Sequence, residues 1–590
     1  MVFLTGVLLA DSFPPFPFHF LVFIAFVPLF VLFETENVPG RVPEDKIFRP
    51  IKATVIVLFR VLTLQFIWRP SKRGIKVMRY RRRTISGNAQ LFRYTYSIFF
   101  LWNLAGSYWL LVAAVRAPEL DDTLVLGAAA LLALLLAPAL MSLPCQLYSR
   151  IRHVLTPVVA AGSFIVFWLT FEYLQFNWEL SFSWLTLGHS LAYYPAWIQY
   201  AEFTGVLGVS FHILVANLLF YRTYRFWDHR KRMPWGRLAI ALVWMALPFA
   251  VGPLLLNESR PVLQPEARLN VRLVQPSLDP HGEEKLMTAE DKMSLFSELA
   301  QSDSLADVDL VILPEKALPR PLARSNAGRD RLLQPLWALV DSHQLDLLTG
   351  LESYAGYPTQ DSAPAGATPG FAMGDSGRQA AWIATWNSAF LLRRDRALDM
   401  YDKGRLAPLV ERIPYLEWFG IFNQFFPGWW SGMGNYAKQD SLVLPETSAG
   451  FRLGVLLSYE SAFGAYARRS TQAGGQAIII ITNNEWWSGT AGYEQHEWYA
   501  TLRAIENRRS VLRSANLGGS RFVNARGESQ ELPNSEAAQV ADFTIELHSG
   551  TTFYAEHGDW IGRMAGWLTL LVIVISLYLN FTPRKRKKRS

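Results

Sequence analysis

Long apolar runs alternate with short polar stretches over the first 256 residues and return at the end of the chain. A bilayer core of about 30 Å requires about 20 predominantly apolar residues as a helix. The segments that meet this requirement are 16–33, 92–114, 122–143, 154–174, 199–221, 237–256 and 562–581. The run 2–10 is too short to span alone, and we interpret it as the remnant or end of a further span. The pattern predicts a polytopic α-helical membrane protein with about eight spans.

The segment 51–67 is also apolar but carries Arg60 at its middle and leads into a strongly basic stretch. A charge at the centre of a bilayer is costly, so we predict an interfacial helix here rather than a span.

Positive charge gathers between the predicted spans. The clusters are Arg69, Lys72, Arg73, Lys76, Arg79, Arg81, Arg82 and Arg83; Arg150 and Arg152; Arg222, Arg225, Arg230, Lys231, Arg232 and Arg237; and the tail Arg584 to Arg589. Alternate threading of the spans brings all four clusters to one side if residues 257–560 lie on the other. Because Lys and Arg are enriched in cytoplasmic loops, we predict that residues 257–560 are extracytoplasmic.

Composition agrees with a membrane protein of more than one domain, since 51% of the 590 residues are hydrophobic and 18% are charged. The net charge of +8 lies in short runs beside apolar stretches, which is typical of topology signals and argues against nucleic-acid binding. Cys145 is the only cysteine, so an internal disulfide and a cysteine-rich metal site are excluded.

From Ala267 onward the apolar runs shorten, as expected for a globular domain. Predicted strands are 269–274, 308–313, 346–350, 387–392, 454–457 and 477–481, and predicted helices are 285–299, 329–343 and 493–506. Near-continuous apolar strands imply a sheet covered on both faces, so we predict an α/β layered sandwich. The stretch 354–378 is rich in Gly, Ala, Pro and Ser without periodicity, and we predict a surface loop or mobile flap.

Strand 308–313 is followed by Glu315, the segment 400–402 leads to Lys403, and strand 454–457 leads to Ser458. Together a carboxylate, an amine and a hydroxyl can act as base, oxyanion stabiliser and nucleophile. Taken singly, each is more simply a surface Glu, a solvated Lys and a serine at the end of a strand.

A series of short motifs in a fixed order is more specific for a protein family than any one of these residues. It comprises Val274-Gln275-Pro276, Leu313-Pro314-Glu315, Trp386-Asn387-Ser388, Lys403 to Leu406 with Pro408, Glu411-Arg412-Ile413-Pro414, Ser458-Tyr459-Glu460-Ser461, Thr482 to Trp487 and Arg503 to Arg509. Over nearly the whole chain this sequence resembles the apolipoprotein N-acyltransferases, the membrane branch of the nitrilase (carbon-nitrogen hydrolase) superfamily. The resemblance implies about eight spans with a nitrilase-like αββα sandwich inserted before the last.

The resemblance also implies roles for individual residues. Glu315 corresponds to the general base, Lys403 to the oxyanion stabiliser, and Ser458 to the nucleophile position. Supporting positions are Glu411, Asn387, Tyr459 and Glu460. Trp184 corresponds to the family's aromatic at the mouth of the lipid entrance, although a membrane-interface residue explains it equally well. Trp486 and Trp487 are expected either to line the substrate entrance or to be core aromatics. Gln175 stands where the family often has a basic residue.

The main departure is Ser458, because the family pattern has its catalytic cysteine at this position. A serine hydroxyl is far less acidic than a thiol, and an oxygen ester is a poorer acyl donor to an amine than a thioester. Three explanations are open: an engineered Cys-to-Ser change, a natural serine-using variant, and a homologue that binds lipid or lipoprotein without catalysis. An engineered or impaired enzyme is favoured over efficient serine catalysis, because the rest of the motif is intact.

The expected activity is transfer of a fatty acyl chain from a membrane phospholipid to the N-terminal amine of the diacylglyceryl-cysteine of a lipoprotein. The alternatives are a membrane-anchored amidase or nitrilase, and a non-catalytic lipoprotein-binding homologue. We expect no cofactor and no metal, since His153, His189, His496 and His557 lack ligand spacing. We further expect a monomer in the bacterial inner membrane, with the catalytic domain on the periplasmic side.

The predicted domains are a transmembrane part at 1–256, which includes an interfacial basic segment at 50–91, a catalytic domain at 257–558, and a final span with a basic tail at 559–590.

Overall fold

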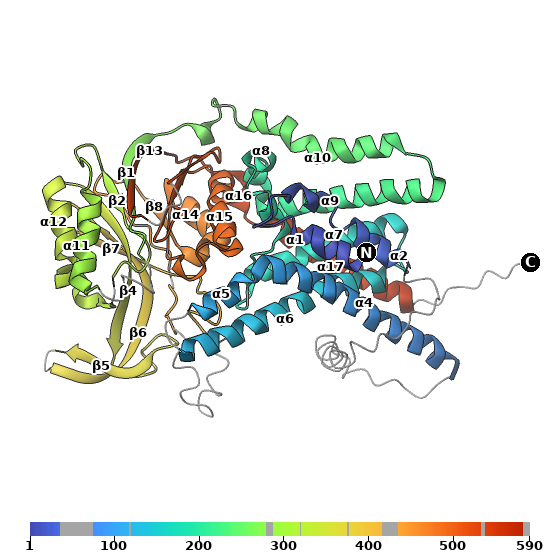
Figure 1. Cartoon of the computed structure of the whole chain (residues 1–590), viewed down its shortest axis with the longest axis horizontal. Coiled ribbons are helices and arrows are strands. Elements are labelled where there is room, and N and C mark those ends of the chain that lie inside the picture. The colour runs from blue at the N-terminus through green and yellow to red at the C-terminus, as the bar shows by residue number, and fades with distance from the viewer. Residues whose placement is uncertain are drawn as a thin grey trace, which may run out of the picture.

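The computed structural model describes residues 1–35, 75–116, 120–278, 287–318, 320–374, 377–415, 435–439, 441–532 and 537–581. The predicted interfacial helix at 51–67 lies outside these residues. In Figure 1 a bundle of long helices occupies one half of the molecule and two stacked sheets with their helices occupy the other.

The helical half is built from α1 (Val2–Ala10), α2 (Val27–Thr35), α4 (Ile75–Ser107), α5 (Trp109–Val115), α6 (Leu120–Ile151), α7 (Pro157–Asn177), α8 (Pro195–Ile198), α9 (Ala201–Arg230), α10 (Trp235–Leu255) and α17 (Trp560–Phe581). Among the described residues, five helices are long and apolar enough to cross a membrane. The helices α4 and α5 make a sixth candidate, bent by 49°. The chain is therefore an integral membrane protein, as predicted.

The predicted span 16–33 differs most from expectation. It contains the 3-10 turn His19–Phe23 followed by the short helix α2, and its continuous apolar helical stretch, His19–Glu34, is shorter than a full span. The predicted run 2–10 is a separate helix, α1, whose Gly6 lies close to Leu101 of α4.

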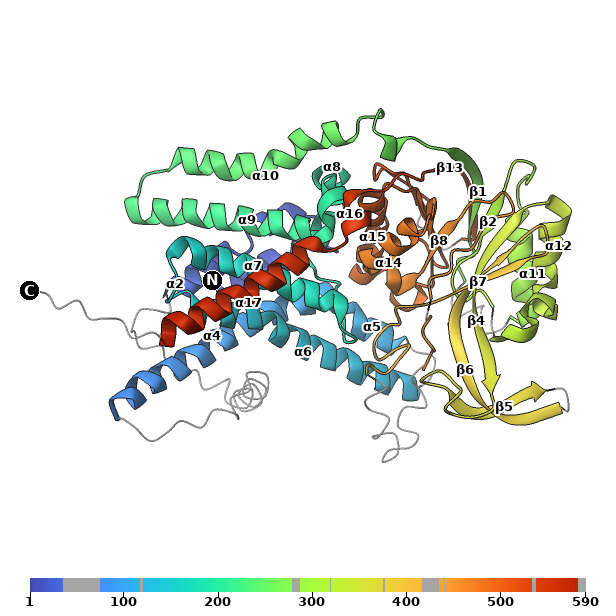
Figure 2. The same ribbon diagram turned by 180° about the vertical axis from the view of Figure 1, so that it is seen from behind.

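The basic clusters that belong to described loops lie at one end of the bundle. The α6–α7 and α9–α10 connections are at the end away from the sheets, and α17 also runs from the sheets toward that end (Figures 1 and 2). The common side that the alternating charge pattern predicts is thus present in the fold.

Two sheets form the other half. Within the described residues one has eight strands, in the order β13-β1-β2-β4-β6-β5 with β3 beside β4 and β7 beside β6, and the other has five, in the order β12-β11-β10-β9-β8. The strands of the first are β1 (Ala267–Gln275), β2 (Leu310–Ile312), β3 (Leu322–Ala323), β4 (Asp346–Tyr357), β5 (Thr368–Gly374), β6 (Gly377–Leu392), β7 (Leu398–Asp402) and β13 (Gln539–Leu547). Those of the second are β8 (Leu453–Leu457), β9 (Ala477–Thr482), β10 (Val511–Ala515), β11 (Arg521–Val523) and β12 (Ser529–Glu531).

Four layers result, with helices outside both sheets. The first sheet is covered by α11 (Ala289–Ala300) and α12 (Gln334–His343), and the second by α14 (Gly464–Gln472) and α15 (Ala491–Asn507), while α16 (Phe553–His557) precedes α17. Apolar side chains on alternate positions of β1 and β8, such as Leu273 and Val455, meet in the core between the sheets. The predicted αββα sandwich is confirmed.

The stretch 354–378 was predicted as a surface loop or mobile flap, and the loop prediction holds only for residues 358–367. It contains the end of β4, the strand β5 and the start of β6, and Tyr357 pairs with Trp382 while Thr368 pairs with Ile383. Backbone hydrogen bonds hold this antiparallel ladder irrespective of the side-chain pattern. Because many of its residues are small, the sequence shows no alternation of apolar and polar positions from which the strands could be predicted.

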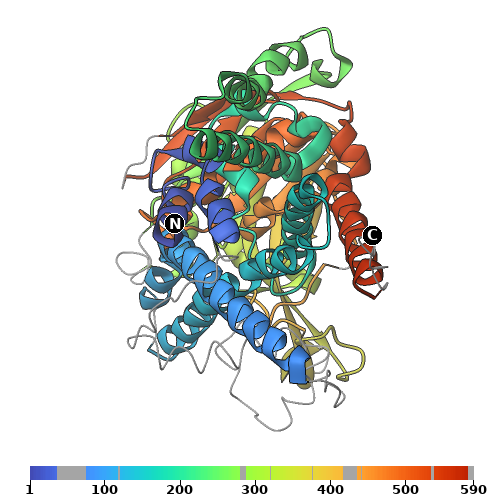
Figure 3. The same cartoon turned by 90° about the vertical axis from the view of Figure 1, so that its right-hand side faces the viewer.

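The two halves share buried contacts at α15. Arg508 Nε lies 2.6 Å from Glu202 Oε2, and both side chains are almost fully buried. The backbone N–H of Val206 donates to Glu506 over 3.0 Å. Gly205 has a φ of 61° and packs so closely on the ring of Tyr554 that a Cβ would lie 2.4 Å from it. Figure 3 views the molecule from the helical half, with the helices in front of the sheets.

Candidate functional site

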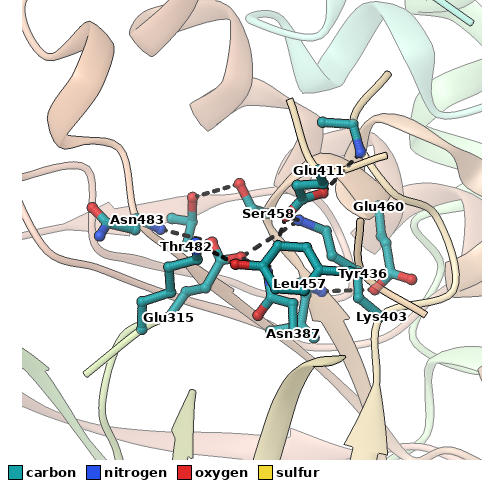
Figure 4. A network of polar contacts seen from close by, with 12 residues as sticks. Glu315, Asn387, Lys403, Glu411, Tyr436, Leu457, Ser458, Glu460, Thr482 and Asn483 are labelled. Carbon is teal, nitrogen blue, oxygen red and sulfur yellow. Dashed lines mark hydrogen bonds and ion pairs between the residues drawn. The ribbon is translucent and has the colours of Figure 1, made fainter. Parts of the chain in front are cut away.

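Three strand ends bring the predicted site residues together. Glu315 follows β2, Lys403 follows β7, and Ser458 follows β8, and all three are buried, with exposed fractions of 4%, 2% and 6%. Figure 4 shows them around one centre. Side chains at the ends of neighbouring strands converge at one edge of a layered sheet, which is why residues distant in sequence meet here.

Lys403 is held between two carboxylates. Its Nζ lies 2.7 Å from Glu411 Oε1 and 3.4 Å from Glu315 Oε1. Burial works against the charged ammonium, but the charges of Glu411 and Glu315 outweigh it and raise the pKa of Lys403. Burial likewise opposes the Glu411 carboxylate, yet Lys403 and the N–H of Ala407 lower the pKa of Glu411. The ammonium is thus charged and held between two carboxylates, and a cation held in this way can stabilise an oxyanion.

Asn387 connects the same two carboxylates. Its Nδ2 donates over 2.7 Å to Glu315 Oε1 and over 3.0 Å to Glu411 Oε1. The other oxygen of Glu315, Oε2, accepts from the backbone N–H of Asn483 at 2.9 Å. Both carboxylate oxygens of Glu315 are therefore held by hydrogen bonds, which fix its orientation.

Ser458 occupies a strained turn. Its φ is 45°, in the left-handed region that residues with a side chain seldom adopt. The hydroxyl of Thr482 donates to Ser458 Oγ over 3.2 Å, the hydrogen bond that Ser458 Oγ makes among the described residues. The serine oxygen faces the cluster, but its immediate partner is another hydroxyl rather than a carboxylate (Figure 4).

Glu460 ties the turns after β7 and β8 together. Its Oε1 accepts from the backbone N–H groups of Gly404 at 2.7 Å and Arg405 at 3.0 Å. Its Oε2 accepts from the N–H of Leu457 at 2.8 Å and from the hydroxyl of Tyr401 at 2.9 Å. Since Gly404 follows Lys403 and Leu457 precedes Ser458, the Glu460 carboxyl group fixes the distance between the backbones that carry Lys403 and Ser458.

Aromatic side chains from the helical half cover the site. Trp184 stacks on Tyr459 with 6.1 Å between ring centroids and 11° between planes. Trp109 lies 5.1 Å from Trp184 and 5.4 Å from Trp487. The hydroxyl of Tyr459 also donates to the backbone oxygen of Ser181. Tyr459, the residue after the nucleophile position, therefore packs directly against the connection that follows α7 in the helical half.

Other predicted aromatic and polar positions lie close by. Trp486 belongs to the 3-10 turn Glu485–Trp487, and its side chain is outside the described part of the structure. Gln175 accepts through its side-chain oxygen from Trp178 Nε1 at 3.2 Å.

Two known protein families match the two halves of this chain. Residues 74–219 match the apolipoprotein N-acyltransferase N-terminal domain, and residues 270–577 match the carbon-nitrogen hydrolase family. The apolipoprotein N-acyltransferase of Chlorobaculum tepidum is 30% identical over 422 residues, which cover 69% of this chain and 76% of the relative. The chain belongs to the apolipoprotein N-acyltransferases.

The chain is also similar to a second acyltransferase and, more distantly, to two solved structures. The apolipoprotein N-acyltransferase of Geobacter metallireducens is 25% identical over 67% of this chain and 70% of the relative. A mutant of the amidase of Nesterenkonia AN1 from the nitrilase superfamily is 14% identical, with a TM-score of 0.32, and the match covers 51% of this chain and 97% of that one. Nit3 of Saccharomyces cerevisiae, a member of branch 10 of that superfamily, is also 14% identical, with a TM-score of 0.32 over 55% of this chain and 98% of that one.

Cys145 cannot serve this acyltransferase in place of Ser458. It is buried in α6, 25 residues beyond the helix start at Leu120, which is roughly 38 Å along a helix. The start of α6 is the end near the site, because Arg116, just before it, donates to the backbone oxygen of Ser488 over 2.8 Å.

Several residues of the site escaped the sequence argument. Trp109, Tyr401 and Thr482 contact the predicted residues, and His496, which was considered only as a metal ligand, lies 3.0 Å from the backbone oxygen of Ser458. These contacts join residues that are far apart in the sequence, so no local sequence pattern predicts them. Only Thr482 could have been recognised from the sequence. It opens the motif Thr482 to Trp487 and ends β9, the strand that pairs with β8.

The Lys403–Glu411 pair predicts acid sensitivity. Because the pKa of Glu411 is lowered on folding, its contribution to stability is present above its unfolded pKa and is lost as pH falls through the lower folded value. We expect the thermal midpoint to fall more between about pH 5 and about pH 3, which runs below the unfolded Glu pKa of about 4.3, than it does in Glu411→Gln. Equal slopes for the two proteins in a thermal-shift series would contradict the pairing.

Proposed function

We propose that this chain transfers a fatty acyl chain from a membrane phospholipid to the α-amine of the diacylglyceryl-cysteine of a lipoprotein, through an acyl-enzyme at residue 458. The family supports N-acylation of lipoproteins. The observation that carries the proposal is the direct packing of the nucleophile turn on the helical half, through Tyr459 and Trp184. Both substrates are anchored in a bilayer, so they must reach the site from that side.

The first half-reaction uses the three strand-end residues. The oxygen of Ser458, or the sulfur of a cysteine at that position, attacks the ester carbonyl carbon while its proton passes to Glu315. Lys403 and a backbone N–H stabilise the tetrahedral oxyanion. The ester C–O bond then breaks, the lysophospholipid oxygen takes the proton from Glu315, and the acyl-enzyme remains.

The second half-reaction repeats these proton transfers, with residue 458 now as the leaving group. The lipoprotein amine attacks the acyl-enzyme carbonyl, and Glu315 takes a proton from the nitrogen. The bond to residue 458 breaks, Glu315 returns the proton to that residue, and an amide is formed. Asn387 and Asn483 keep Glu315 in one orientation for all four proton movements.

A non-catalytic lipoprotein-binding role is the second candidate, and one observation favours it. The Ser458 hydroxyl is hydrogen-bonded to Thr482, whereas Glu315 is occupied by Asn387, Lys403 and Asn483. Such an arrangement retains the substrate site while lacking an activated nucleophile.

We further propose a periplasmic position for the catalytic domain, residues 257–558, in the bacterial inner membrane. The basic loops lie at the end of the bundle away from the sheets, and the positive-inside rule assigns that end to the cytoplasm. The transmembrane part is then 1–256 together with the final span in 559–590, and the protein acts as a monomer.

The test uses the chain as given and its Ser458→Cys form, each reconstituted in phospholipid vesicles with a diacylated lipopeptide. The expected product is a lipopeptide heavier by one acyl chain, together with lysophospholipid, and Glu315→Gln in the Ser458→Cys form should stop both. Release of free fatty acid, or hydrolysis of a soluble amide without vesicles, would replace the proposal with the amidase alternative. Binding of the lipopeptide without turnover in both forms would favour the non-catalytic role.

A further inference from the structure

A histidine lies behind the nucleophile turn, on the face of the turn next to α15. His496 is 1% exposed, and its Nε2 lies 3.0 Å from the backbone oxygen of Ser458. Its ring stacks on Trp184, with centroids 5.6 Å apart and 22° between planes, and meets Tyr499 edge-on at 6.0 Å. Neither the carboxylate cluster nor the proposed reaction uses this side chain.

The neighbours of His496 determine which nitrogen carries its hydrogen. The guanidinium of Arg513 lies 3.2 Å from Nδ1, and it can only donate, so Nδ1 must present its lone pair. Burial and the charge of Arg513 lower the pKa of His496 to about 3, so the ring is neutral. In a neutral ring the remaining hydrogen is then on Nε2, the atom that faces the Ser458 carbonyl.

The Ser458 carbonyl thus receives two hydrogen bonds. One comes from His496 Nε2, which also lies 3.0 Å from the hydroxyl oxygen of Ser461, and the other comes from the hydroxyl of Ser461 at 2.7 Å. Because a trans peptide places C=O and N–H on opposite sides, fixing this oxygen toward α15 turns the N–H of Tyr459 to the opposite side. The same contacts hold the backbone of Ser458 at its positive φ of 45°.

We infer that His496 is a positioning residue for acyl transfer, which orients the peptide between residues 458 and 459 so that the N–H of Tyr459 serves with Lys403 as the oxyanion donor. The inference rests on the proposed function in taking residue 458 as the nucleophile. It does not depend on the identity of the acyl acceptor.

The test compares His496→Phe and His496→Gln in the Ser458→Cys protein, folded in phospholipid vesicles. The first reaction is acylation by a p-nitrophenyl ester, in which the sulfur introduced at position 458 bonds to the carbonyl carbon, the C–O bond breaks and nitrophenolate leaves. The second is alkylation of the same thiol by iodoacetamide, which has no oxyanion. Peptide mapping assigns both adducts to position 458, and the thermal midpoint reports folding.

The Phe variant should lower the acylation rate by about 30-fold or more, as loss of a positioned oxyanion donor does. Alkylation should change by no more than about threefold, because the thiol and its base are untouched. The Gln variant should regain most of the acylation rate, since its side-chain amide supplies an N–H. Should the Phe protein not fold, His496→Met takes its place as the variant without a donor.

Three results would overturn the inference: an unchanged acylation rate in the Phe variant, a parallel fall in alkylation, or a Gln variant no faster than Phe. If the parent Ser458→Cys protein is alkylated but never acylated, the proposed nucleophile fails as well. If the parent protein is acylated but leaves the lipopeptide unmodified, only the proposed acceptor is wrong. The comparison of the His496 variants then still tests the positioning role of His496.

Discussion

Ser458→Cys is expected to raise the rate of lipopeptide N-acylation by about a thousandfold or more over the chain as given. With an ordinary pKa of about 8.5, a thiol can give its proton to a carboxylate assisted by a nearby ammonium, whereas a serine hydroxyl cannot do so to a useful extent. The gain applies to both half-reactions, because a thioester also acylates an amine more readily than an oxygen ester does.

Initial rates of lipopeptide mass change in vesicles measure this effect. Ser302→Cys is the matched control, since it adds a cysteine in the same half of the molecule at an exposed position just past α11, and it should leave the rate at the level of the parent chain. A comparable rate for the parent chain and its Ser458→Cys form would refute the thiol argument and establish a serine-based acyltransferase. A large gain would mean that this chain is a disabled form of a competent scaffold.

Lys403→Met in the Ser458→Cys protein should lower acyl transfer by about 10²- to 10³-fold, because the oxyanion loses a fixed cation in a dry site. It should also destabilise the fold by about 3–5 kcal/mol, because Glu411 and Glu315 would remain buried without their counter-charge. Loss of activity alone would therefore not separate a catalytic role from a structural one.

A double variant separates these roles. In Lys403→Met with Glu411→Gln, one buried charge is removed with its partner, so the thermal midpoint should largely recover while acyl transfer stays low. Single-turnover acylation rates and thermal midpoints of the four proteins form a complete cycle. Recovery of transfer together with stability would show that Lys403 serves only to keep the fold intact.

Much of this architecture follows from local sequence. Strands such as β8 and β9 are unbroken apolar runs, so their position and the reactive residue at the end of β8 could be predicted. Glu315, Lys403 and Ser458 do converge, as expected of strand ends. The spans other than 16–33 were predictable for the same reason, since about 20 consecutive apolar residues are long enough to cross a bilayer as a helix.

What could not be predicted depends on contacts between distant elements. The stacking of Trp184 on Tyr459 joins residues 275 positions apart, and neither residue shows in sequence that it has a partner. The bend between α4 and α5 brings Trp109 to the site and is likewise set by packing. The β4–β5–β6 ladder was missed because backbone hydrogen bonding, rather than alternating side chains, defines it.

The buried surroundings of α15 have a consequence for how this protein can be divided. Nearly every residue of the helix is buried, because one face packs on the second sheet and the other on the membrane helices. Arg508, just past its end, is neutralised by Glu202 from α9. A soluble fragment cut free at the linkers would expose an apolar helix face and an orphaned guanidinium. The α/β layers are therefore not a domain that can be separated from its membrane anchor. The helical bundle is part of the structure of the enzyme.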